Sequence, residues 1–248
     1  MRFTTDGLIL KEQTIKEKDK LVTVFTRSNG LIRCFVRNAR NIKSVLSSST
    51  QPLNYSRLSI YEGRDSYIID EADSIAMFYE LREDLEKLSL ANYFCEVCCR
   101  MLPDGQPADE LLSLILNSLY VLLNTDKHPL LIKSVFELRF MGVSGFMPDI
   151  LCCCECGDYE AEKMYFLLNE SKLICSRCYK SGDACPLSRC ALMGLRTALL
   201  TDPKRLFAFE LEGESLYQLA DCAEKFLLTH SEQPFPSLLL YKDIRNMN

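Results

Sequence analysis

Several features that define common enzyme classes are missing from this sequence of 248 residues. It contains only two histidines, His128 and His230, and neither lies near a nucleophile or a carboxylate motif. No general base for proton transfer is therefore apparent. The sequence also lacks a GxxxxGK(S/T) phosphate loop, a GxGxxG turn after a strand pattern and an HExxH helix. Nucleotide hydrolysis, Rossmann dinucleotide binding and metalloprotease chemistry thus have no support, and we expect a protein that is not an enzyme.

Long apolar segments are missing as well. The most apolar stretch, residues 111–123, is interrupted by Ser113, Asn117 and Ser118 and is shorter than the roughly 20 residues that cross a bilayer. Near the N-terminus only residues 8–10 form an unbroken apolar run, which is too short for the core of a signal peptide. We therefore expect no membrane association and a reducing, cytoplasmic location.

The composition fits a folded chain. With 48% hydrophobic residues, 25% charged residues, 10 Gly and 9 Pro, the sequence is neither collagen-like nor broadly disordered. Its length allows one large domain or two to three small ones. We place the domain boundary after residue 78, where the hydrophobic pattern changes.

Residues 1–78 are predicted to form a small β-structure. Short β-type runs separated by turn residues occur at 7–13, 21–26, 31–36, 53–61 and 67–70. Ser28, Asn29 and Gly30 supply the turn of a hairpin from Leu21 to Val36, with Gly30 free to adopt positive φ. The polar stretch from 38 to 51 contains at most a short helix, around Ile42 to Leu46. Five such strands suggest a small, partly open barrel.

Residues 79–248 are predicted to be a helical domain. Leucines recur at three- and four-residue spacing, which is typical of amphipathic helices. Proline-rich breaks at 102–107 and 126–129 separate the first helices, and further helices are predicted at about 130–142, 187–200 and 213–228, with a short one after Pro236. A cysteine-rich insert at about 148–182 interrupts the helices. The expected fold class is therefore α+β and multidomain.

Four of the 13 cysteines have the spacing of a metal site. Cys153 and Cys156 form one CxxC pair, and Cys175 and Cys178 form a second pair after 18 intervening residues. Each CxxC brings two thiolates together on a tight turn, and a hairpin-sized insert returns the second pair to complete a tetrahedron. The pattern predicts one structural Zn²⁺, because four protein ligands leave no position for a catalytic water.

Other interpretations of these cysteines stay open. Buried free thiols or an iron–sulfur centre would also account for four cysteines, and Cys152 or Cys154 could replace a ligand by a one-residue slip. A third CxxC, Cys95 to Cys98, lies in a helical pattern without a second pair, so we interpret it as core packing.

Charge is divided unequally along the chain. Residues 1–60 contain 11 Lys/Arg and 4 Asp/Glu, a net charge of +7, which leaves −12 for the remainder of a chain whose total is −5. No Asp or Glu occurs between Lys20 and Tyr61. Such a surface attracts phosphates, and interleaved aromatics could stack unpaired bases. The candidate DNA-binding residues are Lys20, Arg27, Arg33, Arg37, Arg40, Lys43 and Arg57. The alternatives are a solvated charged face and aromatics that only fill the core.

Short motifs in this order resemble those of the RecO family of bacterial recombination mediators. Residues 17–26, Asn29-Gly30 and Arg37-Asn38-Ala39-Arg40 are similar to the family's strand-turn-strand and its basic KGAR-like element. Gln51-Pro52-Leu53 is similar to its LQPF stretch, and residues 148–157 resemble its PxLxxCxxCG zinc segment. Three departures are Asn38, where the family usually has Gly, the tripled first cysteine group and the strongly acidic balance of the helical part.

The resemblance implies more than the spacing does. It implies an oligonucleotide-binding (OB) fold at the N-terminus, zinc ligation by Cys153 and Cys156, and binding of single- and double-stranded DNA. It further implies annealing of complementary strands, partnership with RecR and single-strand-binding protein, and a place at the bacterial nucleoid, where the protein helps to load recombinase. We weigh this mediator role against a zinc-stabilised RNA- or protein-binding scaffold and against a thiol-based redox or metal-handling enzyme.

Overall fold

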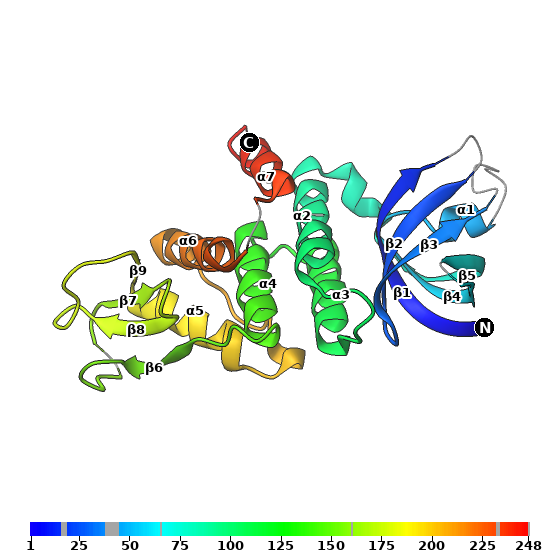
Figure 1. The fold of residues 1–248 in the computed structure, drawn as a ribbon. Coiled ribbons are helices and arrows are strands. Elements are labelled where there is room, and N and C mark those ends of the chain that lie inside the picture. The colour runs from blue at the N-terminus through cyan, green and yellow to red at the C-terminus, as the bar shows by residue number, and fades with distance from the viewer. Residues whose placement is uncertain (16–18, 38–44, 65, 160, 232–233, 248) are drawn as a thin grey trace. The chain divides into compact units, whose positions relative to one another are not determined.

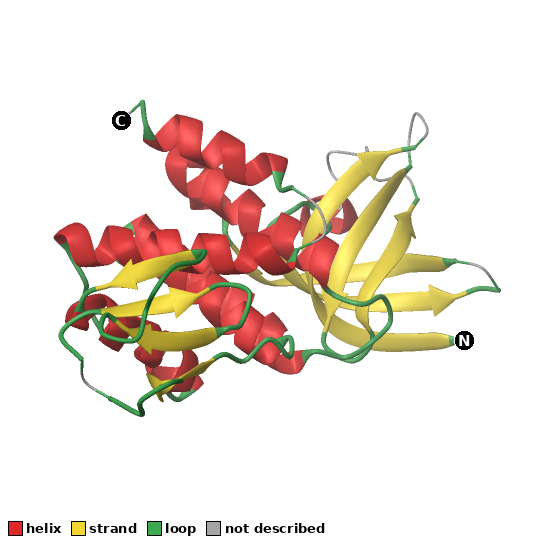
Figure 2. Cartoon of the chain, turned by 60° about the vertical axis from the view of Figure 1, so that its left-hand side comes forward, coloured by secondary structure: helices red, strands yellow, loops and turns green. Residues whose placement is uncertain are grey.

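The computed structural model describes residues 1–15, 19–37, 45–64, 66–159, 161–231 and 234–247. The chain divides into two compact units, each of which is considered by itself. The first unit comprises residues 1–123 together with 235–248, and the second comprises residues 124–234. Figure 1 labels their elements, and Figure 2 distinguishes helices from strands. Among the described residues, no helix is both long enough and apolar enough to cross a bilayer.

The first unit contains five strands that form a closed barrel in the order β1-β2-β3-β5-β4 (Figure 1). The strands are β1 (Arg2–Thr14), β2 (Lys20–Thr26), β3 (Gly30–Val36), β4 (Asn54–Glu62) and β5 (Tyr67–Met77), with helix α1 (Val45–Ser49) between β3 and β4. Strand β1 pairs antiparallel with both β2 and β4, and β3 pairs parallel with β5. The five predicted strands are therefore present.

Alternation along the strands determines which side chains fill the barrel. In β3, Ile32, Cys34 and Val36 are buried in the core together with residues of the other four strands. The opposite face of the same strand carries Arg33 and Phe35, both exposed. The period of two thus explains why apolar and basic residues can share one short strand.

The β2–β3 hairpin confirms the predicted turn. Gly30 has φ of 60°, which a residue with a Cβ rarely adopts. A Cβ at this position would also lie 2.0 Å from the carbonyl oxygen of Gln106, in the loop between helices α2 (Leu85–Met101) and α3 (Asp109–Asn124). That loop is held to the barrel by a hydrogen bond from the Gly105 amide to the Leu31 carbonyl, at 3.1 Å.

Two strand boundaries and one helix differ from the sequence prediction. Strand β5 continues to Met77 instead of ending at Asp70, and β1 begins at Arg2 instead of Gly7. Irregular pairing between β4 and β5 breaks the alternation, so that only Ile69 and Ala72 of β5 are buried. The predicted short helix around Ile42 to Leu46 lies largely outside the described residues, and the described helix α1 continues to Ser49.

Helices complete the first unit. They are the 3₁₀ helix η1 (Tyr79–Glu83) and the α-helices α2 (Leu85–Met101), α3 (Asp109–Asn124) and α7 (Pro236–Arg245). The Asp84 side chain caps α2 by accepting a hydrogen bond from the Lys87 amide at 3.0 Å. Glu96 of α2 accepts one from the Ser237 amide at 2.9 Å, in the first turn of α7. The contact between α2 and α7 thus joins residues that are 141 positions apart.

The second unit combines helices with a small sheet, three strands of which lie within the predicted insert at about 148–182 and the fourth just after it. Its elements are α4 (Pro129–Val143), β6 (Asp149–Cys153), β7 (Met164–Leu167), β8 (Lys172–Cys175), β9 (Ala184–Leu187), α5 (Arg189–Leu200), η2 (Pro203–Arg205) and α6 (Gly213–His230). The strand order is β6-β8-β7-β9. Leu187, predicted as the first residue of a helix, ends β9, because the Ser188 side chain caps α5.

Candidate metal centre and basic surface

The four cysteines of the two CxxC pairs lie together in the second unit. The sulfur atoms of Cys153, Cys156, Cys175 and Cys178 are all within 4.8 Å of one another. The Sγ atoms of Cys156 and Cys175 are 3.7 Å apart. Four sulfurs at about 2.3 Å from a central zinc would be about 3.8 Å apart in a tetrahedron. The donor set and its dimensions therefore fit one tetrahedral metal ion.

Each pair lies at the end of a strand. Cys153 ends β6, and the Gly157 amide donates a hydrogen bond to its carbonyl at 2.9 Å, closing the first turn with Gly157 at φ of 73°. Cys175 ends β8, and the Cys178 amide donates to its carbonyl at 3.0 Å. Strands β7 and β8 are antiparallel neighbours. This hairpin returns the second pair to the first, as the spacing predicted.

Backbone groups stabilise thiolate charge at the cluster. Burial opposes ionisation of Cys153, but N–H groups of Cys156, Cys175 and Glu155 lower its pKa to about 6. The Cys175 amide lies 3.4 Å from the Cys153 sulfur. The pKa of Cys178, in contrast, is raised to about 12 by its hydrogen bonds with Cys156 and Cys175. Such opposite shifts are expected when clustered thiols share protons without a metal, and a metal would displace those protons.

Arg196 of α5 supports the first turn, and no pattern in the sequence indicates this role. Its guanidinium donates to the carbonyls of Ile150 and Leu151, at 3.0 and 2.7 Å, and to that of Tyr159 at 3.1 Å. The same group lies 4.1 Å from the centre of the Tyr159 ring. Arg196 thereby fixes the backbone on both sides of Cys153 and Cys156.

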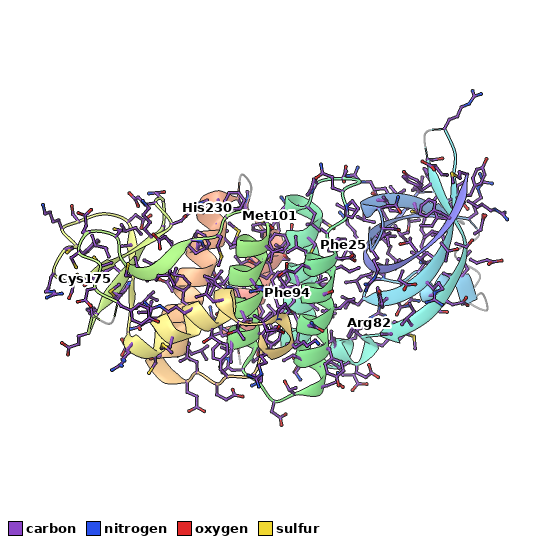
Figure 3. All side chains as sticks on the ribbon, turned by 90° about the horizontal axis from the view of Figure 1, so that it is seen from below. Phe25, Arg82, Phe94, Met101, Cys175 and His230 are labelled. Carbon is purple, nitrogen blue, oxygen red and sulfur yellow. The ribbon has the colours of Figure 1, made fainter. Side chains whose placement is uncertain are left out.

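The other cysteines considered as ligands or as a third CxxC pair are not members of the cluster. Cys152 is half-buried, Cys154 is exposed, and neither belongs to the group of four sulfurs. Cys175, which does belong to that group, is labelled in Figure 3 among the loops of the small sheet. Cys95 and Cys98 of α2 are buried in the first unit, as predicted for core thiols, and Cys99 is half-buried.

Among the predicted DNA-binding residues, Lys20 is largely buried and contacts other parts of the barrel unit. Only 12% of its side chain is exposed. Its ammonium group donates to Glu12 Oε2 and to the Thr50 carbonyl, both at 3.0 Å. Thr50 follows helix α1, so this lysine joins β1 and β2 to the segment whose Leu46 packs against the barrel core.

We predict that Lys20→Met destabilises the barrel. The variant keeps the apolar stem but leaves two acceptors without their charged donor, which should cost about 1.5–3 kcal/mol in unfolding free energy. Urea denaturation measures this cost. Arg57→Met is the matched control, because Arg57 is 63% exposed and its ion pair with Asp6 should contribute about 1 kcal/mol or less. Equal destabilisation in both variants would contradict a structural role for Lys20.

Acids from other parts of the first unit neutralise two of the exposed arginines. Arg27 lies 3.8 Å from Asp109 of α3, and Arg57 lies 3.1 Å from Asp6 of β1. A hydrogen bond to the Tyr55 hydroxyl raises the pKa of Arg27. Residues 20–61 contain no Asp or Glu, but in the folded unit acids from β1 and α3 lie beside two of their arginines.

Arg33 and Arg37 are exposed beside exposed aromatic rings. Arg37 lines one cavity of about 410 Å³ with Phe35 and another of about 450 Å³ with Tyr61. Phe35 and Tyr61 are 37% and 44% exposed. Arginine and aromatic groups thus occur together on the outer surface of the barrel, which is the combination that single-stranded nucleic acids contact.

The remaining candidate residues are either buried or lie outside the described residues. Phe25 and Tyr55, considered as stacking groups, are buried, which favours the core-packing alternative for both. Phe25, labelled in Figure 3, lies on the outer face of β2, between the barrel and the helices of the same unit. Arg40 and Lys43 lie outside the described residues, and their role stays a prediction.

Comparison with known proteins gives matches over nearly the whole chain. The family model described as "Recombination protein O N terminal" matches residues 1–78, and "Recombination protein O C terminal" matches residues 82–239. A protein named DNA repair protein RecO from Acetivibrio thermocellus is 32% identical over 97% of this chain and 96% of its own length. Proteins of the same name from Thermoanaerobacter sp. (strain X514) and Symbiobacterium thermophilum are 28% and 26% identical, over 98% and 95% of this chain and 98% and 94% of their own lengths.

Proposed function

The chain belongs to the RecO family of DNA repair proteins, and we propose that it is a non-catalytic mediator of homologous recombination. In this role it binds single- and double-stranded DNA and promotes annealing of complementary strands. With RecR, it helps to load recombinase onto DNA that is coated by single-strand-binding protein. The observation that carries the proposal is the family match over both parts of the chain, combined with exposed arginines and aromatics on the barrel.

We assign the barrel to the OB-fold. Its strand order, β1-β2-β3-β5-β4 with β1 also paired to β4, describes a five-stranded Greek-key barrel. OB-folds bind oligonucleotides on the face of strands 2 and 3 and with the adjoining loops. Arg33 and Phe35 are on that face of β3, and Arg37 follows it. Their charge would attract phosphates, and the rings would stack unpaired bases.

We assign the sulfur cluster to one structural zinc ion, held by Cys153, Cys156, Cys175 and Cys178. Four thiolate ligands suit Zn²⁺ and close its coordination shell, so the ion would crosslink two turns and take no part in a reaction. Two strands that are each only four residues long, β7 and β8, would be stabilised most by such a crosslink.

The proposal also assigns a role to each of the two predicted domains and a location to the protein. Residues 1–78 act as the DNA-binding domain, and residues 79–248, with the zinc insert at about 148–182, bind RecR and single-strand-binding protein. The protein works in the cytoplasm, at the nucleoid. The family boundaries at 78 and 82 support this division, although helices α2 and α3 group with the barrel in the first compact unit.

The test is a salt titration of DNA binding. We predict that fluorescence anisotropy detects binding to a single-stranded oligonucleotide at about 50 mM salt, and that the logarithm of affinity falls linearly with the logarithm of salt concentration. Each phosphate contact contributes about −0.7 to that slope on a single strand. Absence of binding at low salt would overturn the proposal. If an RNA of the same sequence displaced the DNA at equal concentration, the RNA-binding alternative would replace it.

A further inference from the structure

A cleft in the first unit lies between the outer face of the barrel and helix α2. Its volume is about 580 Å³, within the range of small-molecule sites. Residues of strands β1, β2 and β3 line one wall, and residues of α2 with Ser237 at the start of α7 line the other. Neither the family resemblance nor the sequence prediction placed a DNA contact on α2.

The strand wall presents two cations on either side of a threonine. Lys11 pairs with Thr23, and Thr23 pairs with Arg33, so the three side chains form a row across β1, β2 and β3. Neighbouring strands are about 4.8 Å apart, which places the two cationic residues roughly 10 Å from each other. Lys11 and Arg33 are exposed, and among the residues that the structure describes neither is part of an ion pair.

The next row supplies an apolar surface. Gln13 pairs with Leu21, and Leu21 pairs with Phe35. Leu21 is half-buried and lines the cleft, and Phe35, which is 37% exposed, lies beside it in this row just outside the cleft, so the two offer an apolar surface to a flat ring. A phosphate held by the cationic row and a base lying on this second row would be adjacent, as they are in one nucleotide.

The helix wall supplies polar groups at helical spacing. Asn92, Glu96 and Cys99 are on one face of α2 and line the cleft. Glu96 is engaged by Arg100 at 2.7 Å and by the Ser237 amide at 2.9 Å. Its negative charge is thereby neutralised. Asn92 is exposed and can both donate and accept, as recognition of a base edge requires.

The two walls are close enough to act on the same ligand. Burial raises the pKa of Cys99 on α2 to about 11, while Lys11, Arg33 and Arg100 oppose that rise through their charges. Lys11 and Arg33 of the strand wall and Cys99 of the helix wall line the same cleft.

We propose that this cleft is a nucleotide subsite for single-stranded DNA, in which Lys11 and Arg33 hold a phosphate and Asn92 contacts the edge of an unpaired base. This inference rests on the proposed function and extends the DNA path from the barrel to α2. A paired base cannot enter a cleft of this size together with its partner strand, so the subsite selects single strands over duplex.

Photocrosslinking tests the subsite directly. Full-length protein is irradiated with a single-stranded oligonucleotide that contains 4-thiothymidine, digested with trypsin and mapped by mass spectrometry. Cleavage after Lys87 and Arg100 releases most of α2 as the peptide 88–100, which contains Asn92. We expect a crosslink in this peptide with the single strand and none with a duplex of the same sequence.

Variants provide a second readout. Lys11→Ala should reduce the magnitude of the salt slope by about 0.7, the value of one phosphate contact on a single strand. Lys87→Ala, on the same helix as Asn92 but outside the cleft, removes the same charge and should leave the slope unchanged. If the protein binds single strands but peptide 88–100 is never crosslinked and Lys11→Ala keeps the full slope, the subsite is wrong and the proposed function stands. If no single strand binds at all, both fail.

Discussion

Chelation of zinc is expected to lower the melting temperature of the purified protein by about 10 °C. Zinc present at about a thousand times its dissociation constant contributes about 4 kcal/mol of stability, and each kcal/mol shifts the melting temperature of a domain of this size by about 2–4 °C. The reason for this dependence is local. The β7–β8 hairpin has four-residue strands, and the sulfur cluster connects its end to β6.

A pair of cysteine variants separates a metal effect from a general effect of removing a thiol. Cys156 and Cys154 are both exposed, but only Cys156 belongs to the group of four sulfurs. Cys156→Ser should reduce zinc content, measured by atomic emission, and should lower the melting temperature to that of chelated protein. Cys154→Ser should retain one zinc per chain. Purified protein without metal, and with a melting temperature that chelator does not change, would disprove the structural zinc.

Reversing the charge of two arginines is expected to have the largest effect on DNA binding. Arg33→Glu combined with Arg37→Glu should weaken single-strand affinity by a factor of about 100 or more at about 50 mM salt, because each of the two hydrogen bonds from a charged group contributes about 1.5–3 kcal/mol. The magnitude of the salt slope should fall by about 0.7 for each phosphate that the variant protein no longer neutralises. Anisotropy titrations at several salt concentrations measure both quantities.

The matched control places the same change of charge in the second unit. Lys204 and Arg205 are exposed residues of η2, and the double substitution Lys204→Glu with Arg205→Glu alters the net charge equally. An equal reduction of affinity in both double variants would show that net charge, and not contact with the barrel, governs binding. An unchanged slope in the Arg33/Arg37 variant would exclude these residues as phosphate contacts.

The grouping of the four cysteines could be predicted from the sequence because each half of it is local. A CxxC pair positions two sulfurs through a turn of four residues, so the frame identified Cys153 with Cys156 and Cys175 with Cys178. The length of the insert then predicted the hairpin that brings the halves together. Arg196 was not predictable, because its contacts with Ile150, Leu151 and Tyr159 join segments that are 37 to 46 residues apart.

The basic surface was predicted only in outline. Counting charges along the chain located the excess in residues 1–60, and this count needs no structure. It could not show that Lys20 is nearly buried against the Thr50 carbonyl, or that Asp6 and Asp109 lie beside Arg57 and Arg27. Ion pairs depend on distance in space, and the barrel brings β1 and α3 next to residues far from them in sequence.

The sequence by itself determined the family, the five strands, the helical pattern and the four clustered cysteines, because these depend on local periodicity, on spacing and on the order of motifs. Only the tertiary structure decided the strand order of the barrel, the small sheet around the sulfurs, and which basic side chains among the described residues are exposed without an acidic partner. It also decided that α2 forms a cleft with β1, β2 and β3. Those features arise from pairing and packing between distant segments, which no local pattern encodes.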